Sequence, residues 1–113
     1  MATGPLASRT CKPCEGGVEP LPLSAAQRLL ADVRGWELVE GKQLRKTVTC
    51  KHFMDAVGVI QRIATVAEAE DHHPDLHLTR YKRLTIELST HAIGGLSEND
   101  FILADKIDQL LAA

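Results

Sequence analysis

The sequence predicts a two-layer α+β domain, with a four-stranded antiparallel sheet that carries three helices on one face. Two observations support this fold class. Three segments place apolar residues at spacings of three and four, as amphipathic helices do, and two pairs of short segments alternate apolar and polar residues around tight turns. The elements follow in the order α-β-β-α-β-β-α, so each pair of strands forms a hairpin and the helices pack together on the sheet.

The first and the third predicted helices are marked by their capping residues. "LSAAQRLLADV" (residues 23–33) has a capping box of Ser24 and Gln27, and Gly35 follows as a stop signal. "LSEND" opens the third helix with Ser97 as its N-cap. The apolar stripes expected to face the core are Leu29, Leu30 and Val33 in the first helix and Phe101, Ala104, Ile107 and Leu111 in the third.

The second predicted helix, "KHFMDAVGVIQRIATVAEAE" (residues 51–70), has the strongest periodicity. It must end near Asp71, because Pro74 disfavours helical backbone in the residue before it. The histidines that follow therefore lie on a loop leaving a long, well-anchored helix, which is a rigid support for a site. We expect one wide buried stripe along about five turns, formed by Phe53, Ala56, Val57, Ile60, Ile63, Ala64 and Ala67.

Four short segments read as two β-hairpins. "WELVE" (residues 36–40) and "QLRKTVT" (43–49) are separated by Gly41-Lys42, and "LHLTRY" (76–81) precedes "RLTIELST" (83–90). In the last segment, apolar and polar residues alternate, so one face of the sheet is expected to be buried and the other to face water. The polar face offers a partly exposed cleft.

Length, composition and charge describe an ordinary globular domain. We expect residues 23–113 to form one domain, preceded by an irregular arm over residues 1–22, which is rich in Pro and Gly and shows no period. A net charge of −2 gives no electrostatic footprint for nucleic acid. No apolar run approaches the ~20 residues that a membrane span needs, so we expect neither nucleic acid nor membrane as a partner.

The cysteines point to a reducing compartment. Their odd number, three, argues against a disulfide framework, so we expect a cytoplasmic protein, or a mitochondrial or plastid one if a transit peptide has been removed. Cys11 and Cys14 form a lone Cys-x-x-Cys within "CKPCEGG". This is a weak metal signal, because zinc needs four ligands, and it lacks the following helix of a thioredoxin-like motif. A metal or redox role for the pair stays open.

Three histidines lie within six residues in "EDHHPDLHLTRY" (residues 70–81), although the whole chain has only five. A zinc site could combine His72 and His91 with a carboxylate, but the spacing gives zinc no particular support. A solvated surface is the simpler interpretation for His77, which lies in a predicted strand, and for His52 at the start of the second helix.

Proton transfer is the third interpretation of the histidines. Imidazole titrates near pH 6.5, so it gives or takes a proton at neutral pH with little tuning. The neighbouring carboxylates of Glu68, Glu70 and Asp71 could fix its tautomer. Several such groups without a nucleophile suit an elimination or a hydration. The sequence contains no serine elbow, Gly-rich phosphate loop or paired Cys/His arrangement that would indicate another reaction.

The spacing of these residues resembles one known family. Glu68, His72, His73 and Pro74 are followed by Tyr81, by His91 within "LSTHAIGGLSENDF", and by Asp100. In this pattern the chain resembles the pterin-4a-carbinolamine dehydratases, the dimerisation-cofactor-like proteins. "GWELVEG" and "HFMDAVGVIQRIA" extend the likeness over about residues 24–111. "CKPCEGG" resembles an extension found in a plant and bacterial branch of the family.

The resemblance implies a hydro-lyase that needs no metal or organic cofactor. Members of the family dehydrate 4a-hydroxytetrahydropterin, the product of aromatic amino acid hydroxylases, to quinonoid dihydropterin in tetrahydrobiopterin recycling. By this likeness, one histidine takes the N5 proton and another protonates the departing 4a-hydroxyl, with His73 as the base and His72 or His91 as the acid. The implied substrate-binding residues are Glu68, Pro74, Thr90, Ala92 and Asp100.

The resemblance also implies a homodimer or homotetramer, joined through helices or sheet edges, and an aromatic amino acid hydroxylase as a pathway partner. Two alternatives belong to other classes of function. One is a non-catalytic module that binds a pterin or a protein, as animal members do as dimerisation cofactors of a homeodomain transcription factor. The other is a role with a different pterin, in molybdenum-cofactor metabolism.

Overall fold

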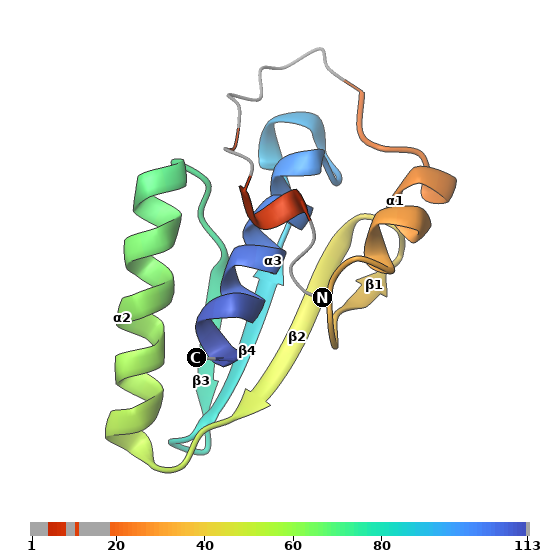
Figure 1. Cartoon of the computed structure of the whole chain (residues 1–113). Helices are drawn as coiled ribbons and strands as arrows, with labels where there is room; N and C mark the ends of the chain where they lie inside the picture. Colours follow the sequence, from red (N-terminus) through yellow and green to blue (C-terminus); the bar gives the residue numbers. More distant parts are fainter. Residues whose placement is uncertain (1–4, 9–10, 12–18, 113) are drawn as a thin grey trace.

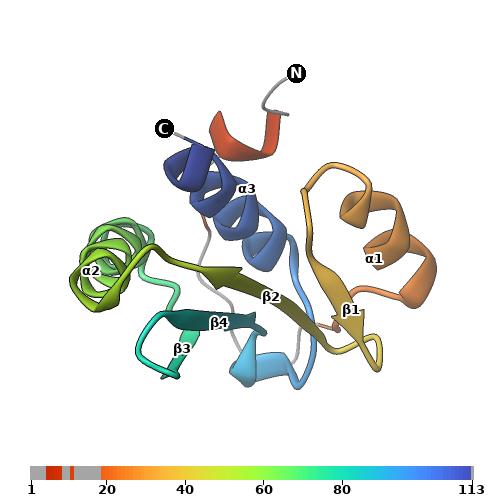
Figure 2. The same cartoon turned by 90° about the horizontal axis from the view of Figure 1, so that it is seen from below.

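A four-stranded antiparallel sheet lies beneath the α-helices, which pack on one of its faces (Figures 1 and 2). The structure is a computed structural model that describes residues 5–8, 11 and 19–112. Its described elements are the 3-10 helices η1 (Pro5–Ser8) and η2 (His91–Ile93), the α-helices α1 (Leu23–Leu30), α2 (Phe53–Glu70) and α3 (Glu98–Ala112), and the strands β1 (Glu37–Val39), β2 (Gln43–Thr49), β3 (Asp75–Thr79) and β4 (Arg83–Leu88). The predicted fold class and element order are confirmed.

The two predicted hairpins join in the order β1-β2-β4-β3. The central pair is β2 and β4, in which Leu44 lies opposite Leu88 and Val48 opposite Leu84. Alternation along β4 buries Leu84, Ile86 and Leu88, as the sequence predicts. The edge strands β1 and β3 each pair on one side only, so both edges of the sheet remain unpaired within the described chain.

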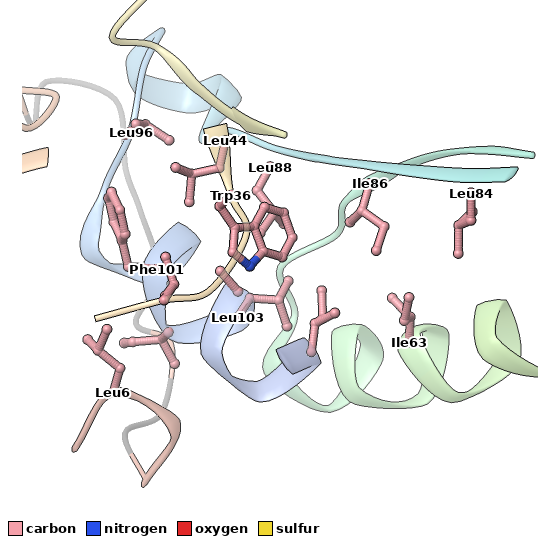
Figure 3. Packing of buried hydrophobic residues seen from close by; sticks show 14 of the residues in the cluster. Leu6, Trp36, Leu44, Ile63, Leu84, Ile86, Leu88, Leu96, Phe101 and Leu103 are labelled. Carbon is pink, nitrogen blue, oxygen red and sulfur yellow. The ribbon is translucent and has the colours of Figure 1, made fainter. Parts of the chain in front are cut away.

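The core lies between this sheet and the helices (Figure 3). Leu44, Ile86 and Leu88 point from the sheet toward Leu103 of α3, and Ile63 of α2 extends the same layer. These side chains are almost fully removed from water. Burial of this kind contributes roughly 25 cal/mol per Å² of apolar surface, so the core dominates the stability of the sheet-and-helix unit.

The helices differ from the sequence predictions at their ends and flanks. α1 begins at Leu23 after Pro22, with no side-chain cap hydrogen bond, so the predicted capping box of Ser24 is wrong. The N-cap is Pro22, in extended backbone, and Ser24 lies inside the first turn of the helix. α2 buries Val59, which the predicted stripe omits, and of the seven predicted residues it buries Ala56, Ile63 and Ala67. Phe53 is 50% exposed, and Ala64 also faces water.

The N-terminal segment contributes to the core at one point. Leu6, in η1, is 1% exposed and joins the buried cluster beside Phe101 (Figure 3). η1 packs against α3 (Figure 2). Farther along, the backbone N–H of Leu21 donates to the carbonyl of Leu96 at 2.8 Å. The described residues ahead of α1 are therefore attached to the domain at Leu6, at Cys11 and at Leu21.

None of the helices in the described ranges combines the length and the hydrophobicity needed to cross a bilayer.

Candidate active site

A cavity of about 460 Å³ opens between the end of α2, the exit of β4 and the start of α3. This volume lies within the ~300–1,000 Å³ typical of small-molecule sites. Polar and ionisable side chains make up most of its wall. The lining residues are Cys11, Glu70, Asp71, His72, His73, Ser89, Thr90, His91, Ala92 and Asn99.

The end of α2 places the first two histidines. Asp71 adopts a left-handed backbone, with φ of 52°, and its N–H and that of His72 close the last turn of the helix on Ala67 and Glu68. The chain then extends through Pro74 into β3. The predicted helix end near Asp71 is confirmed, and this abrupt change of direction brings His72 and His73 onto the cavity wall.

His72 is held by a buried carboxylate. Its Nε2 atom lies 2.7 Å from Oδ1 of Asp100, a residue of α3 with no exposed surface. The other carboxylate oxygen accepts from the Thr90 hydroxyl at 2.7 Å and from the Ser97 backbone N–H at 2.9 Å. An ionised carboxylate can only accept hydrogen bonds, so Nε2 of His72 carries the hydrogen and Nδ1 remains available. The contact with Asp100 thus fixes the ring orientation and the tautomer of His72.

The hydrogen bonds around Asp100 also include the hydroxyl of Ser97, the residue just before α3. The hydroxyls of Thr90 and Ser97 lie 2.8 Å apart. Because the single hydroxyl hydrogen of Thr90 is directed at Asp100, Ser97 is the donor to Thr90. Asp100 also completes one half of a capping box for α3, since it accepts from the N–H of the residue that precedes the helix. The carboxylate therefore stabilises the helix start and orients His72 at once.

His73 has a carboxylate partner of a different kind. Its Nε2 atom lies 2.7 Å from Oε2 of Glu68, one turn earlier on α2. The side chains of His73 and Glu68 are 54% and 77% exposed. Water screens a pair of this exposure, so it orients the imidazole more than it stabilises the fold.

His91 lies at the tip of a short loop after β4. Thr90 and Gly95 close the loop through a backbone bridge, with N–H to carbonyl distances of 2.7 and 3.4 Å. Gly94 has a φ of 67°, which favours glycine, and its N–H caps η2 at His91. Within the described part of the chain, the His91 side chain forms no hydrogen bond or ion pair. It is the histidine most available to a ligand.

The structure brings the three predicted histidines to one cavity and places the other candidate residues around them. Thr90 and Ala92 line the cavity directly. Glu68 and Asp100 connect to it through the histidines that they contact, and Pro74 follows His73 at the exit toward β3. The two remaining histidines have structural contacts elsewhere. His77 lies 2.9 Å from Glu87 across the sheet, and His52 caps α2 by accepting from Asp55 N–H at 3.1 Å.

Five wall residues were missed by the sequence prediction of the site. Ser89 and Asn99 adjoin predicted residues, so their position next to Thr90 and Asp100 could have indicated them. Glu70 and Asp71 were considered only as partners of a histidine. Cys11 comes from a segment more than fifty residues away, and its place in the wall depends on tertiary contacts.

Cys11 is fixed in the wall by two hydrogen bonds. Its backbone N–H donates to Oε1 of Glu70 at 2.7 Å, and its thiol donates to the Asn99 carbonyl at 3.6 Å. Burial, followed by the charge of Glu70 and its hydrogen bond, raises the pKa of the Cys11 thiol to about 12. At neutral pH this group is a neutral thiol. The other cysteine of the predicted Cys-x-x-Cys pair, Cys14, lies outside the described residues.

We expect Cys11 to react with iodoacetamide at pH 8 roughly 50-fold more slowly than a free cysteine. A rise in pKa from 9.0 to about 12 removes most of the thiolate, and the higher nucleophilicity of what remains offsets only part of that loss. Mass spectrometry of the Cys11 peptide measures the rate. Glu70→Gln keeps the hydrogen-bond acceptor but removes the charge, so it should speed the reaction. A wild-type rate equal to that of free cysteine would contradict the buried position.

The described residues do not form a site of three or more His, Cys, Asp or Glu side chains that could hold a metal ion. The donors around the cavity are instead arranged in pairs, in which a carboxylate contacts one nitrogen of a histidine. Such pairs set the tautomer of an imidazole and leave its other nitrogen free to exchange a proton. The fold and the cavity thus define a small α+β protein with a cavity whose wall carries histidines paired with carboxylates.

Comparisons with known proteins specify the family. The family described as "Pterin 4 alpha carbinolamine dehydratase" matches residues 19–110. A protein of Nitrosomonas eutropha named "Putative pterin-4-alpha-carbinolamine dehydratase" is 46% identical over 107 residues, covering 94% of this chain and 93% of its own. The Arabidopsis thaliana protein "Pterin-4-alpha-carbinolamine dehydratase 2, mitochondrial" is 43% identical over 93% of this chain and 58% of its own.

A solved structure agrees with these sequence matches. The "transcriptional coactivator/pterin dehydratase from Brucella Melitensis" superposes with a TM-score of 0.75 and 30% identity, over 81% of this chain and 98% of its own. The chain belongs to the pterin 4 alpha carbinolamine dehydratase family, a family of hydro-lyases. The family resemblance seen in the sequence is confirmed, and the assignment of "CKPCEGG" to a plant and bacterial branch stays a prediction.

Proposed function

We propose that the protein removes water from 4a-hydroxytetrahydropterin to give quinonoid dihydropterin, as a step in tetrahydropterin recycling. One observation carries the proposal. In a chain of this family, three histidines from two distant segments line a single cavity, and two of them are each oriented by a carboxylate. The reaction breaks the C4a–O and N5–H bonds and forms the N5=C4a double bond. It needs one group that accepts a proton and one that donates a proton.

His73 is the proposed base at N5. With Glu68 ionised, its Nε2 carries the hydrogen directed at that carboxylate, and Nδ1 is free to accept a proton. The proposed acid is His72 or His91, which protonates the 4a-hydroxyl as it leaves as water. General acid–base assistance of this kind typically contributes ~10²–10⁴-fold.

The remaining candidate residues would hold the ring and the histidines. Thr90 and Ala92 border the cavity and are proposed to contact the pterin, as is Pro74, which follows His73 in the chain. Asp100 and Glu68 act through His72 and His73, and Glu68 is exposed enough to reach the amino-pyrimidine edge as well. The proposed reaction changes no oxidation state, so protons and water are the only species that the protein must move.

The proposed organisation is a homodimer or homotetramer of a domain over residues 23–113, preceded by the arm of residues 1–22. Two features support self-association: the unpaired sheet edges of β1 and β3, and the exposed apolar side chains Phe53 and Met54 at the start of α2. Cys11 and Cys50 are both free thiols, which supports a reducing compartment such as the cytoplasm. An aromatic amino acid hydroxylase is the proposed source of the substrate.

The test is dehydration of 4a-hydroxytetrahydropterin generated in situ, followed by ultraviolet absorbance. We expect the protein to accelerate the reaction at least ~100-fold over buffer. The same protein, heat-denatured, is the control. If the native protein is no faster than buffer, the dehydratase proposal is wrong. A chain that binds the pterin without turnover would then be a binding module, as the alternative interpretation has it.

A further inference from the structure

A second cavity, of about 270 Å³, adjoins the candidate active site. The two cavities share Ser89, Thr90 and His91 as a common wall. The opposite wall of the second cavity comes from the β1–β2 hairpin, through Val39, Glu40, Lys42 and Gln43. His91 therefore stands at the boundary between the two spaces, with one on each side.

Strand pairing explains why the hairpin turn lies there. Leu44 of β2 is opposite Leu88 of β4, so one further residue along each strand brings Gln43 beside Ser89. The turn that precedes Gln43 is then held over the loop that carries His91. Sheet register thus fixes the position of the second cavity relative to the histidines, and flexible side chains are not needed to form it.

The polar side chains of the hairpin wall are available to a ligand. Within the described residues, Glu40, Lys42 and Gln43 form no side-chain hydrogen bond or ion pair. One carboxylate, one ammonium and one amide together offer both acceptors and donors. The carboxylate of Glu40 disfavours an anionic ligand, and an uncharged group with several hydroxyls can use both kinds of partner.

The position of C6 in the proposed substrate also favours the second cavity as the place where a ligand group binds. In a pterin, C6 is bonded to N5 and lies two bonds from C4a, so a substituent on C6 starts at the reacting end of the ring. If the reacting atoms lie beside the histidines, that substituent begins next to them. The space on the far side of His91 is then the nearest cavity that can receive it.

We propose that the second cavity is a subsite for the C6 substituent of the pterin, and that Glu40 and Lys42 select a short hydroxylated side chain. This inference rests on the proposed function. A hydroxyl accepts from the Lys42 ammonium and donates to the Glu40 carboxylate. The residues that determine side-chain preference are therefore separate in sequence from the histidines that carry out the proton transfers.

The test compares two substrates that differ only at C6, with a methyl or a dihydroxypropyl group. We expect wild type to favour the dihydroxypropyl substrate ~10-fold in kcat/KM, since two hydrogen bonds are added. Lys42→Met and Glu40→Ala should each lower this ratio ~3-fold or more. Lys51→Met changes an exposed lysine outside both cavities and should leave the ratio at its wild-type value.

Equilibrium binding separates this inference from the proposed function. Isothermal titration of the two corresponding 7,8-dihydropterins gives the ratio of Kd values without any turnover. A Kd ratio that falls in Lys42→Met and Glu40→Ala supports the subsite, even if dehydration fails. A ratio near one in wild type, or one that neither substitution changes, would overturn it and place the substituent elsewhere.

Discussion

His73→Ala and His91→Ala are each expected to lower kcat for dehydration by about 10²–10⁴-fold, the usual contribution of a general acid or base. Each substitution removes an imidazole from the cavity, and His72, which remains there, has its Nε2 atom held by Asp100. Both side chains are exposed, so their loss should leave the fold intact. Steady-state kinetics gives the rates, and circular dichroism shows whether the fold is retained.

His77→Ala is the matched control for these substitutions. It removes an equally exposed histidine from β3, whose contact is Glu87 on the sheet face, outside the cavity. Its dehydration rate should equal that of wild type within a factor of about two. If His73→Ala and His91→Ala retain full activity, the histidine mechanism is wrong even if the protein is a dehydratase.

Asp100→Asn should also lower kcat strongly. Asp100 is proposed to act through His72 and not through a contact with the substrate. In wild type, two donors, Thr90 Oγ1 and Ser97 N–H, converge on one carboxylate oxygen of Asp100. In the variant, the side-chain amide oxygen of the asparagine must take the position of that oxygen. The amide NH₂ then faces His72, whose Nε2 must become an acceptor. With Nε2 as an acceptor, His72 can no longer carry hydrogens on both ring nitrogens, as it must when it acts as the proposed acid through Nδ1. We expect kcat to fall ~10²-fold or more, as for a wrong tautomer.

The pH profile distinguishes this positioning role of Asp100 from a structural one. A change of tautomer should alter the pH dependence of kcat, and loss of a buried charged hydrogen bond should lower the free energy of unfolding by only about 1–3 kcal/mol. Glu68→Gln is the comparison, because its contact with His73 is exposed to water and its effect should be smaller. An Asp100→Asn protein with wild-type kcat and pH profile would refute the role.

Local sequence patterns were sufficient to predict the elements of the fold. Alternation of Leu84, Ile86 and Leu88 predicts a strand with one buried face, because successive side chains of a strand point to opposite sides. Pro74 predicts the end of α2, because its ring restricts the residue before it. Both rules act over a few residues, so the sequence expresses them without reference to the rest of the chain.

The exposed flank of α2 shows the limit of periodicity. Phe53 and Ala64 fit the apolar spacing as well as Ile63 does, yet they face water. Spacing gives the width of an apolar stripe, and the sheet and α3 determine which part of it they cover. The buried arc of α2 is therefore a property of the packing, and its uncovered flank is where we propose that another copy can bind.

The candidate site depends both on local sequence and on tertiary contacts. Local sequence is enough to predict the element order, the loop that carries His72 and His73, and the residue types suited to proton transfer, since each follows from neighbouring residues. Three features of the site appear only in the folded chain: Cys11 joins the wall, Asp100 contacts His72, and His91 lies between two cavities. These contacts join residues distant along the chain, and they depend on sheet register and helix packing, which no local pattern encodes.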